Sequence, residues 1–148
     1  MLLMRRASAC ALAIAIALAG PAAAQKKDHA KGSHFKVTPP ADVKAAWTLI
    51  TTKVSDAEKS IAAKELEPVH EAGEHLEAAV HVLKEKSTMV SADKQKKLRS
   101  AVEQLRKAVD EMHHAAEDKD ASRAGLGLAK IKMLLPLVEA QYPSGALH

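Results

Sequence analysis

The sequence contains very few aromatic residues: one Phe, one Trp and one Tyr among 148 residues. Proteins that bind single-stranded nucleic acid stack bases on several aromatic side chains, so the composition disfavours this class. The formal net charge of +4 comes from 22 basic and 18 acidic residues. Removal of Arg5 and Arg6 with the signal peptide that is predicted below leaves 20 basic residues against 18 acidic ones. We therefore expect no nucleic-acid partner.

Cysteine is equally scarce, because Cys10 is the only one and lies in an apolar N-terminal run. A basic start, MLLMRR, precedes ASACALAIAIALAG and then PAAAQ, which has the small residues that a signal peptidase accepts. The apolar run is shorter than the about 20 residues that a membrane span needs. We predict a signal peptide over residues 1–24, cleaved after Ala24, and a periplasmic or secreted chain without a membrane span.

The predicted mature chain consequently has no thiol. This excludes disulfides, thiolate metal sites and covalent haem attachment through Cys-x-x-Cys-His. Residues 25–40 lack periodicity and are predicted to form a flexible leader that contains His29 and His34. Residues 41–143 lack alternating strand-like runs and are rich in Ala, Leu, Lys and Glu, which favours helix. Residues 144–148 are predicted to be a tail.

Apolar residues recur at spacings of three and four in four segments of residues 41–143, which predicts four amphipathic helices. Short connections between such helices favour an all-α, up-down-up-down antiparallel four-helix bundle. The predicted core stripes are Val43, Trp47, Ile50, Val54, Ala57 and Ile61; Val69, Gly73, Leu76, Val80 and Leu83; Leu98, Val102, Leu105, Val109, Met112 and Ala116; and Ala121, Ala124, Leu128, Ile131, Leu135 and Val138.

Capping residues and prolines set the expected helix ends. The second helix opens at Glu67-Pro68, and Pro136 is expected to bend the fourth helix without ending it. The predicted cap residues are Thr38, Ser91 and either Asp118 or Asp120.

The predicted bundle gathers histidines and carboxylates at one pole. The end of helix 1, the start of helix 2, the end of helix 3 and the start of helix 4 meet there. The opposite pole, KEKSTMVSADKQKK, is basic and has no histidine. The residues of the first pole are Glu65, Glu67, His70, Glu71, Glu74, His75, Met112, His113, His114, Glu117, Asp118 and Asp120.

His70 and His113 are the candidate metal ligands at this pole. A turn near Met89 places His113 about five residues closer to the pole than His70, and the lean of helical side chains then brings the two rings together. Glu74 and Glu117 each follow one of these histidines by four residues, on the same helix flank. Two imidazoles and two carboxylates are a ligand set that divalent transition metals accept.

A second interpretation of the same pole is a solvated, well-capped helix end. Acidic residues suit the first turn of a helix and histidines suit the last turn, through the helix dipole alone. His114 is expected to point away from the core, His75 lies on the other flank, and His81 lies roughly 16 Å along the helix from His70. Met112 falls on the apolar stripe and is expected to pack in the core.

The segments PVHEAGEHLEAAVHVL and LRKAVDEMHHAAEDKDASRAGLGLAKIKMLLPLVEAQYP give the chain a resemblance to small periplasmic helical bundles. It resembles both the soluble b-type cytochrome and cytochrome c-prime architecture and the histidine-bearing periplasmic proteins of metal-resistance systems. The cytochromes require a haem-attachment motif, or a methionine early in helix 1 and a histidine late in helix 4. This chain has Val43 and Lys44 at the first place and no histidine in helix 4, so an electron carrier with non-covalent haem is the least favoured alternative. The metal-resistance resemblance implies sensing or buffering of a divalent ion at His70 and His113.

Enzyme activity finds no support in the motifs. The sequence has no nucleophile–base pair and no glycine-rich phosphate loop. Glu67 and His70 form a Glu-x-x-His pair, but helices 1 and 4 lack the inward-facing partners of a di-iron site. We predict a non-enzymatic periplasmic bundle that binds Cu(II), Ni(II) or Zn(II) through His70, His113, Glu74 and Glu117. The alternative is a helical interaction or structural module without metal, whose partner is a periplasmic protein.

Overall fold

The computed structural model describes residues 35–148, and all structural statements below concern this part of the chain. It contains four α-helices and no strand: α1 (Val43–Ala62), α2 (Glu67–Lys86), α3 (Ala92–Glu117) and α4 (Ala121–Glu139). The prediction of an all-α chain with four helices is confirmed. The predicted signal peptide, Cys10, His29 and His34 lie outside the described residues.

Side-chain caps define the starts of two helices. Asp42 caps α1 by accepting a hydrogen bond from the Ala45 N–H at 2.8 Å. The prediction that Thr38 caps this helix is wrong, because the residues up to Asp42 are not helical and a carboxylate already accepts the free N–H. Asp120 caps α4 by accepting from the Arg123 N–H at 2.9 Å, as one of the two predicted alternatives.

The two other helix starts follow the predicted positions. Pro68 lies in the first turn of α2, where its missing N–H leaves no helical hydrogen bond unmade. Ser91 is the residue before α3, although its hydroxyl makes no capping hydrogen bond to the helix backbone. α4 continues through Pro136 to Glu139, so the proline does not end this helix.

The core is formed by the predicted apolar stripes. Ile50, Leu76, Leu105 and Ile131, one from each helix, are all 0% exposed. Met112 is also fully buried, as predicted. The predicted core residues that are only partly buried are Ile61, Ala121 and Leu135.

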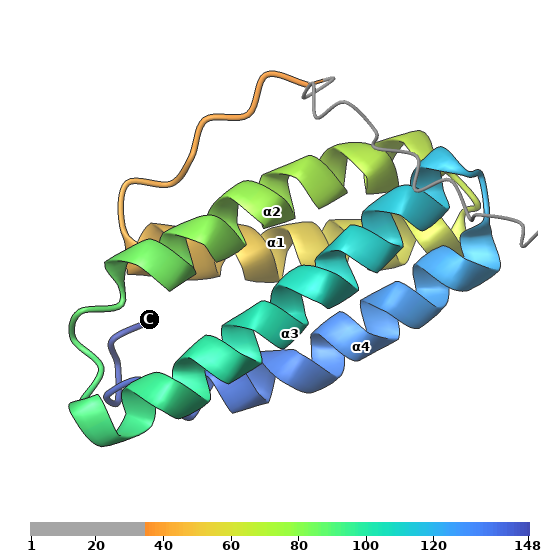
Figure 1. Cartoon of the computed structure of the whole chain (residues 1–148). Helices are drawn as coiled ribbons and strands as arrows, with labels where there is room; N and C mark the ends of the chain where they lie inside the picture. Colours follow the sequence, from red (N-terminus) through yellow and green to blue (C-terminus); the bar gives the residue numbers. More distant parts are fainter. Residues whose placement is uncertain (1–34) are drawn as a thin grey trace, which may run out of the picture. The chain divides into compact units, whose positions relative to one another are not determined.

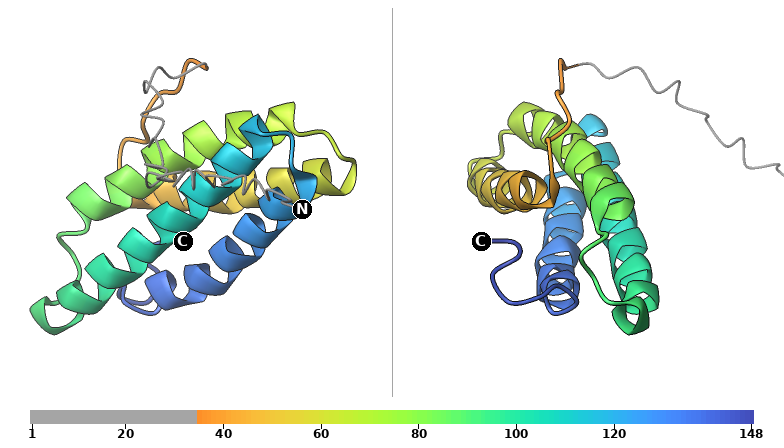
Figure 2. Two further views of the ribbon diagram at one scale, coloured as in Figure 1. Left: turned by 45° about the vertical axis from the view of Figure 1, so that its right-hand side comes forward. Right: turned by 90° about the vertical axis from the view of Figure 1, so that its left-hand side faces the viewer.

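The helices pack as two pairs, α1 with α2 and α3 with α4, with α2 also against α3 (Figure 1). The pairs come together at the end that carries the loops before α2 and α4, and they diverge towards the other end (Figures 1 and 2). No helix within residues 35–148 has an apolar stretch long enough to cross a membrane.

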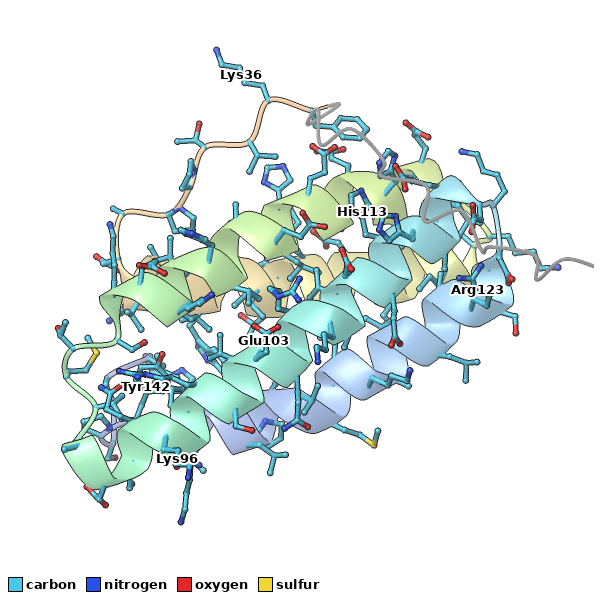
Figure 3. All side chains as sticks on the ribbon, viewed as in Figure 1. Lys36, Lys96, Glu103, His113, Arg123 and Tyr142 are labelled. Atoms are coloured by element: carbon cyan, nitrogen blue, oxygen red, sulfur yellow. The ribbon has the colours of Figure 1, made fainter. Side chains whose placement is uncertain are left out.

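The C-terminal residues pack at the diverging end. Tyr142 and Leu147 are buried, and the Tyr142 hydroxyl hydrogen-bonds to the Ser87 hydroxyl in the loop after α2 (Figure 3). Lys86 also donates to the Ala41 carbonyl at 2.7 Å, which ties the end of α2 to the start of α1. The last residues therefore close this end of the bundle.

A glycine permits the close approach of α4 to α3. A Cβ atom built on Gly127 would lie 2.9 Å from the N, Cα and Cβ atoms of Met112. These are mostly backbone atoms, which cannot rotate away. Gly125, two residues earlier on the same helix, has only Ile61 Cγ2 near it, at 3.9 Å.

Gly127→Ala should therefore reduce the free energy of unfolding by about 1–3 kcal/mol, because it forces α3 and α4 apart. Gly125→Ala is the matched control and should raise it by up to about 1 kcal/mol through helix propensity. Urea denaturation followed by circular dichroism measures both values. Equal stability of the two variants would show that α3 and α4 do not approach closely at Met112.

Candidate metal site

Two histidine rings lie in contact where the helix pairs come together. His70 is in the first turn of α2, and His113 is near the end of α3 (Figure 3). The ring centroids are 4.7 Å apart and the ring planes differ by 26°, so the rings are stacked. The His70 and His113 side chains are only 8% and 12% exposed. The structure thus brings the two predicted ligands together in a largely buried place.

Gly73 makes room for the His113 ring. A Cβ atom at position 73 would lie 2.8 Å from His113 Cβ and 2.9 Å from His113 Cγ. Any side chain at this position would displace the imidazole. The His113 side chain therefore packs directly on the backbone of α2.

The register between α2 and α3 differs from the one expected. His113 lies opposite Gly73, whereas a turn near Met89 places it opposite Glu65. The reason is that α3 has 26 residues and α2 has 20, and the first turns of α3 project beyond the end of α2 (Figure 1). The rings still meet, but His70 is the one nearer to the pole.

Carboxylates surround the two rings. Glu117 Oε1 lies 3.5 Å from His70 Nε2, and Glu77 Oε1 lies 2.8 Å from His113 Nδ1. His70, His113 and Glu117 each offer one ligand atom, and these three atoms lie within 4.8 Å of one another. Nε2 of His113 is buried and has no hydrogen-bond partner within residues 35–148.

Glu74, the fourth predicted ligand, lies beside this group of three. Its Oε1 atom is 4.0 Å from His70 Nε2. Its Oε2 atom accepts a hydrogen bond from the Phe35 N–H at 3.1 Å. The Phe35 ring meets the His70 ring edge-on at 5.4 Å. Glu74 therefore links His70 to the segment that precedes α1.

The two imidazoles have opposite pKa shifts. Burial lowers the pKa of His70 below its ordinary 6.5, the His113 ring lowers it further, and the opposing effect of Glu117 is smaller. Burial also disfavours the charged form of His113, but the hydrogen bond and charge of Glu77, aided by Glu117 and Glu74, outweigh it and raise the pKa of His113 above 6.5. A hydrogen bond from His114 is the main cause that lowers the pKa of the Glu117 carboxyl.

The remaining histidines lie outside this contact. His75 pairs with Glu71 on its own helix at 3.6 Å, and His81 is exposed. His114, which was predicted to point away from the core, is 42% exposed, but its Nδ1 atom lies 2.8 Å from Glu117 Oε2.

Sequence reasoning missed the roles of Glu77 and Gly73. Glu77 is seven residues, or two turns, after His70 and therefore shares its face of α2. This signal was available, but the expected register placed Glu77 too far from His113. The apolar spacing places Gly73 on the core stripe but does not explain why this residue is a glycine.

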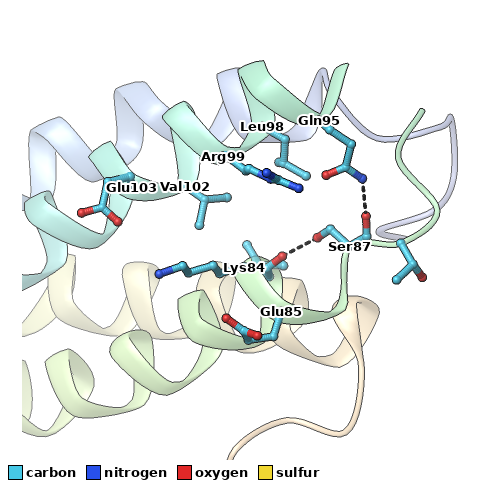
Figure 4. Close-up of a pocket in the computed structure, with 10 residues that line it drawn as sticks. Lys84, Glu85, Ser87, Gln95, Leu98, Arg99, Val102 and Glu103 are labelled. Atoms are coloured by element: carbon cyan, nitrogen blue, oxygen red, sulfur yellow. Dashed lines mark hydrogen bonds between the residues drawn. The ribbon is translucent and has the colours of Figure 1, made fainter. Parts of the chain in front are cut away.

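A separate cleft lies between α2 and α3 at the diverging end, with a volume of about 610 Å³. Figure 4 shows Lys84, Arg99 and Glu103 among its lining residues, and the hydrogen bonds that hold Ser87. No histidine lines it. This cleft is therefore distinct from the histidine contact.

Comparison with protein-family models, with curated proteins and with solved structures finds no match to this chain. The resemblance to periplasmic helical bundles thus stays a prediction. The proposed function therefore rests on the geometry of His70, His113 and the carboxylates around them.

The opposite shifts predict the titration of the metal-free protein. Nitrogen-15 NMR should find the protonation midpoint of His113 above pH 6.5 and that of His70 below it. Glu77→Gln should lower the His113 midpoint, because the amide keeps an acceptor oxygen but removes the negative charge. Glu71→Gln, which alters the partner of His75, should leave both midpoints unchanged. Identical midpoints for the two rings would contradict the contact between Glu77 and His113 as the cause of the difference.

Proposed function

We propose that this chain binds a divalent transition-metal ion, of the Zn(II), Cu(II) or Ni(II) class, through His70, His113 and Glu117. The observation that carries the proposal is the convergence of one ligand atom each from His70, His113 and Glu117 within 4.8 Å. In addition, Nε2 of His113 is buried without a hydrogen-bond partner in residues 35–148. A buried polar atom without a partner is costly unless a proton or an ion occupies it. A metal ion would supply the missing partner.

The chemistry of the group supports this class of metal. Imidazole nitrogen and carboxylate oxygen suit Zn(II), Cu(II) and Ni(II), whereas Mg(II) and Ca(II) prefer oxygen ligands alone. Zinc ligands lie about 2.0–2.2 Å from the ion, so the three ligand atoms would have to draw closer together, and the stacked rings would have to turn until their in-plane lone pairs meet at the ion. Glu74 lies at 4.0 Å from His70 Nε2 and is the nearest additional carboxylate.

The role that follows is buffering or sensing of the ion rather than catalysis. We also propose a periplasmic or secreted location, because the N-terminal sequence has the pattern of a signal peptide. We further propose that the four helices follow one another in up-down-up-down order. That order is supported by the contacts that join the end of α3 to the start of α2, such as that of Glu117 with His70.

The double-mutant test is direct. His70→Ala and His113→Ala should each weaken Zn(II) binding by about 100-fold or more, a larger loss than the roughly 10–100-fold seen for outer-shell residues. The double variant should lose little more, because the two ligands act as a unit. Competition with a chromophoric chelator measures the affinities. His81→Ala is the control and should bind as the unaltered chain does; small, additive losses in the two single variants would contradict a shared site.

One observation favours the alternative of an interaction module. Leu126, Met133 and Leu137 are 63%, 67% and 55% exposed, and their spacing of seven and four places them on one face of α4. They border grooves between α3 and α4, the larger of about 410 Å³. Exposed apolar faces of this kind often mark contact surfaces.

If this face mediates self-association, light scattering should show a mass that rises with concentration, and replacement of all three residues by Gln should abolish the rise. The same triple variant should leave Zn(II) affinity unchanged, because none of the three residues belongs to the group of His70, His113 and Glu117. A constant mass for the unaltered chain would remove the support for self-association through α4.

A further inference from the structure

We propose that Glu77 and His114 are positioning residues of the metal site: Glu77 fixes the His113 ring so that Nε2 is the ligand atom, and His114 holds Glu117 so that Oε1 faces His70. This inference rests on the proposed metal site and adds the residues that organise it. Neither residue contacts the ion in this arrangement. Each instead holds one ligand through the atom that the ion does not use.

The hydrogen bond between Glu77 and His113 determines which nitrogen of the His113 ring carries the hydrogen. A carboxylate can only accept hydrogen bonds, so the 2.8 Å contact between Glu77 Oε1 and His113 Nδ1 requires the hydrogen to be on Nδ1. In a neutral imidazole the other nitrogen then carries a lone pair. Nε2 is that nitrogen; it is buried, and His113 is one of the three residues whose ligand atoms converge. Metal-binding histidines almost always donate their other N–H to such an acceptor.

His114 orients the carboxylate of Glu117. His114 Nδ1 lies 2.8 Å from Glu117 Oε2, while Glu117 Oε1 lies 3.5 Å from His70 Nε2. One oxygen is therefore engaged by His114 and the other is directed at the site. The His113 and His114 rings are nearly parallel, at 8° and a centroid distance of 5.7 Å. Adjacent positions at the end of α3 thus serve different purposes: the first presents a ligand and the second orients one.

The two pairs also predict how Glu117 binds. With Oε2 already accepting a hydrogen bond from His114, Oε1 is the oxygen with more capacity left for an ion. The carboxylate should therefore bind through one oxygen, as ligands of a four-coordinate transition-metal site do, rather than through both, as in many calcium sites. The outer residues thereby favour the same metals as the ligands themselves.

Glu77 is tested by two substitutions and a matched control. Glu77→Ala should weaken Zn(II) binding by about 10–100-fold. Glu77→Gln should recover part of that loss, because the amide oxygen accepts the same hydrogen bond. Glu71→Ala removes the partner of the more exposed His75 and should leave the affinity unchanged. Glu77 is 36% exposed on its side chain, and circular dichroism verifies that each variant is folded.

A second readout separates positioning from a merely structural role. Nitrogen-15 NMR of the metal-free chain, at a pH where both rings are neutral, should show the Nδ1–H tautomer of His113. Glu77→Ala should shift this tautomer towards Nε2–H, while Glu77→Gln should preserve it. An unchanged tautomer and unchanged Zn(II) affinity in Glu77→Ala would overturn the role of Glu77.

His114 is tested in the same way. His114→Ala should weaken Zn(II) binding by about 10-fold or more, and His114→Gln, whose amide N–H can donate to Glu117, should restore part of it. Equal affinities in His114→Ala and the unaltered chain would overturn its role. Failure of the proposed function has a different signature: the unaltered chain would bind no Zn(II), Cu(II) or Ni(II) although the Nδ1–H tautomer of His113 persisted, and Glu77 would then be structural only.

Discussion

Two imidazole rings share one largely buried contact, and the cost of burying them governs the arrangement around them. Stacking alone does not satisfy four ring nitrogens, and a second positive charge beside the first is unfavourable. Glu77 and Glu117 approach the rings from α2 and α3, and Glu74 lies next to His70. The carboxylates make this region favourable for one added positive charge. A metal ion bound as proposed above would therefore compete with a proton on His113 for the same negative surroundings.

The sequence was sufficient for the fold because each helix carries a regular apolar stripe. Residues such as Ile50, Leu76, Leu105 and Ile131 were assigned to the core from spacing alone and are fully buried. The first helix start was misassigned, since Thr38 and Asp42 are both acceptable caps and local sequence does not rank them. Helix ends depend on single hydrogen bonds, whereas stripes depend on many residues.

The candidate site was only partly predictable from the sequence. Spacing on one helix placed Glu74 near His70, and shared polarity at one pole brought His70 towards His113. Glu117, which was paired with His113 by the same spacing, instead contacts His70 and His114. Contacts between helices depend on register, and the packing of His113 on Gly73 gives a register different from the one expected from a turn near Met89. The contact of Glu77 with His113 was not predicted for this reason. His114 was set aside because it points away from the core, although it lies only three residues before Glu117, with which it forms a hydrogen bond. Outer residues of a site are therefore harder to predict than its ligands.

The packing of His113 on Gly73 makes the geometry of the two rings a local property of α2 and α3. α2 ends at Lys86, 13 residues or about 20 Å along the helix from Gly73, and the loop of residues 87–91 follows. The alignment of the rings is fixed by a backbone surface and not by the length of this connection. Changes in the length of the loop are thus expected to leave the pair of rings intact, whereas any side chain at position 73 would separate them.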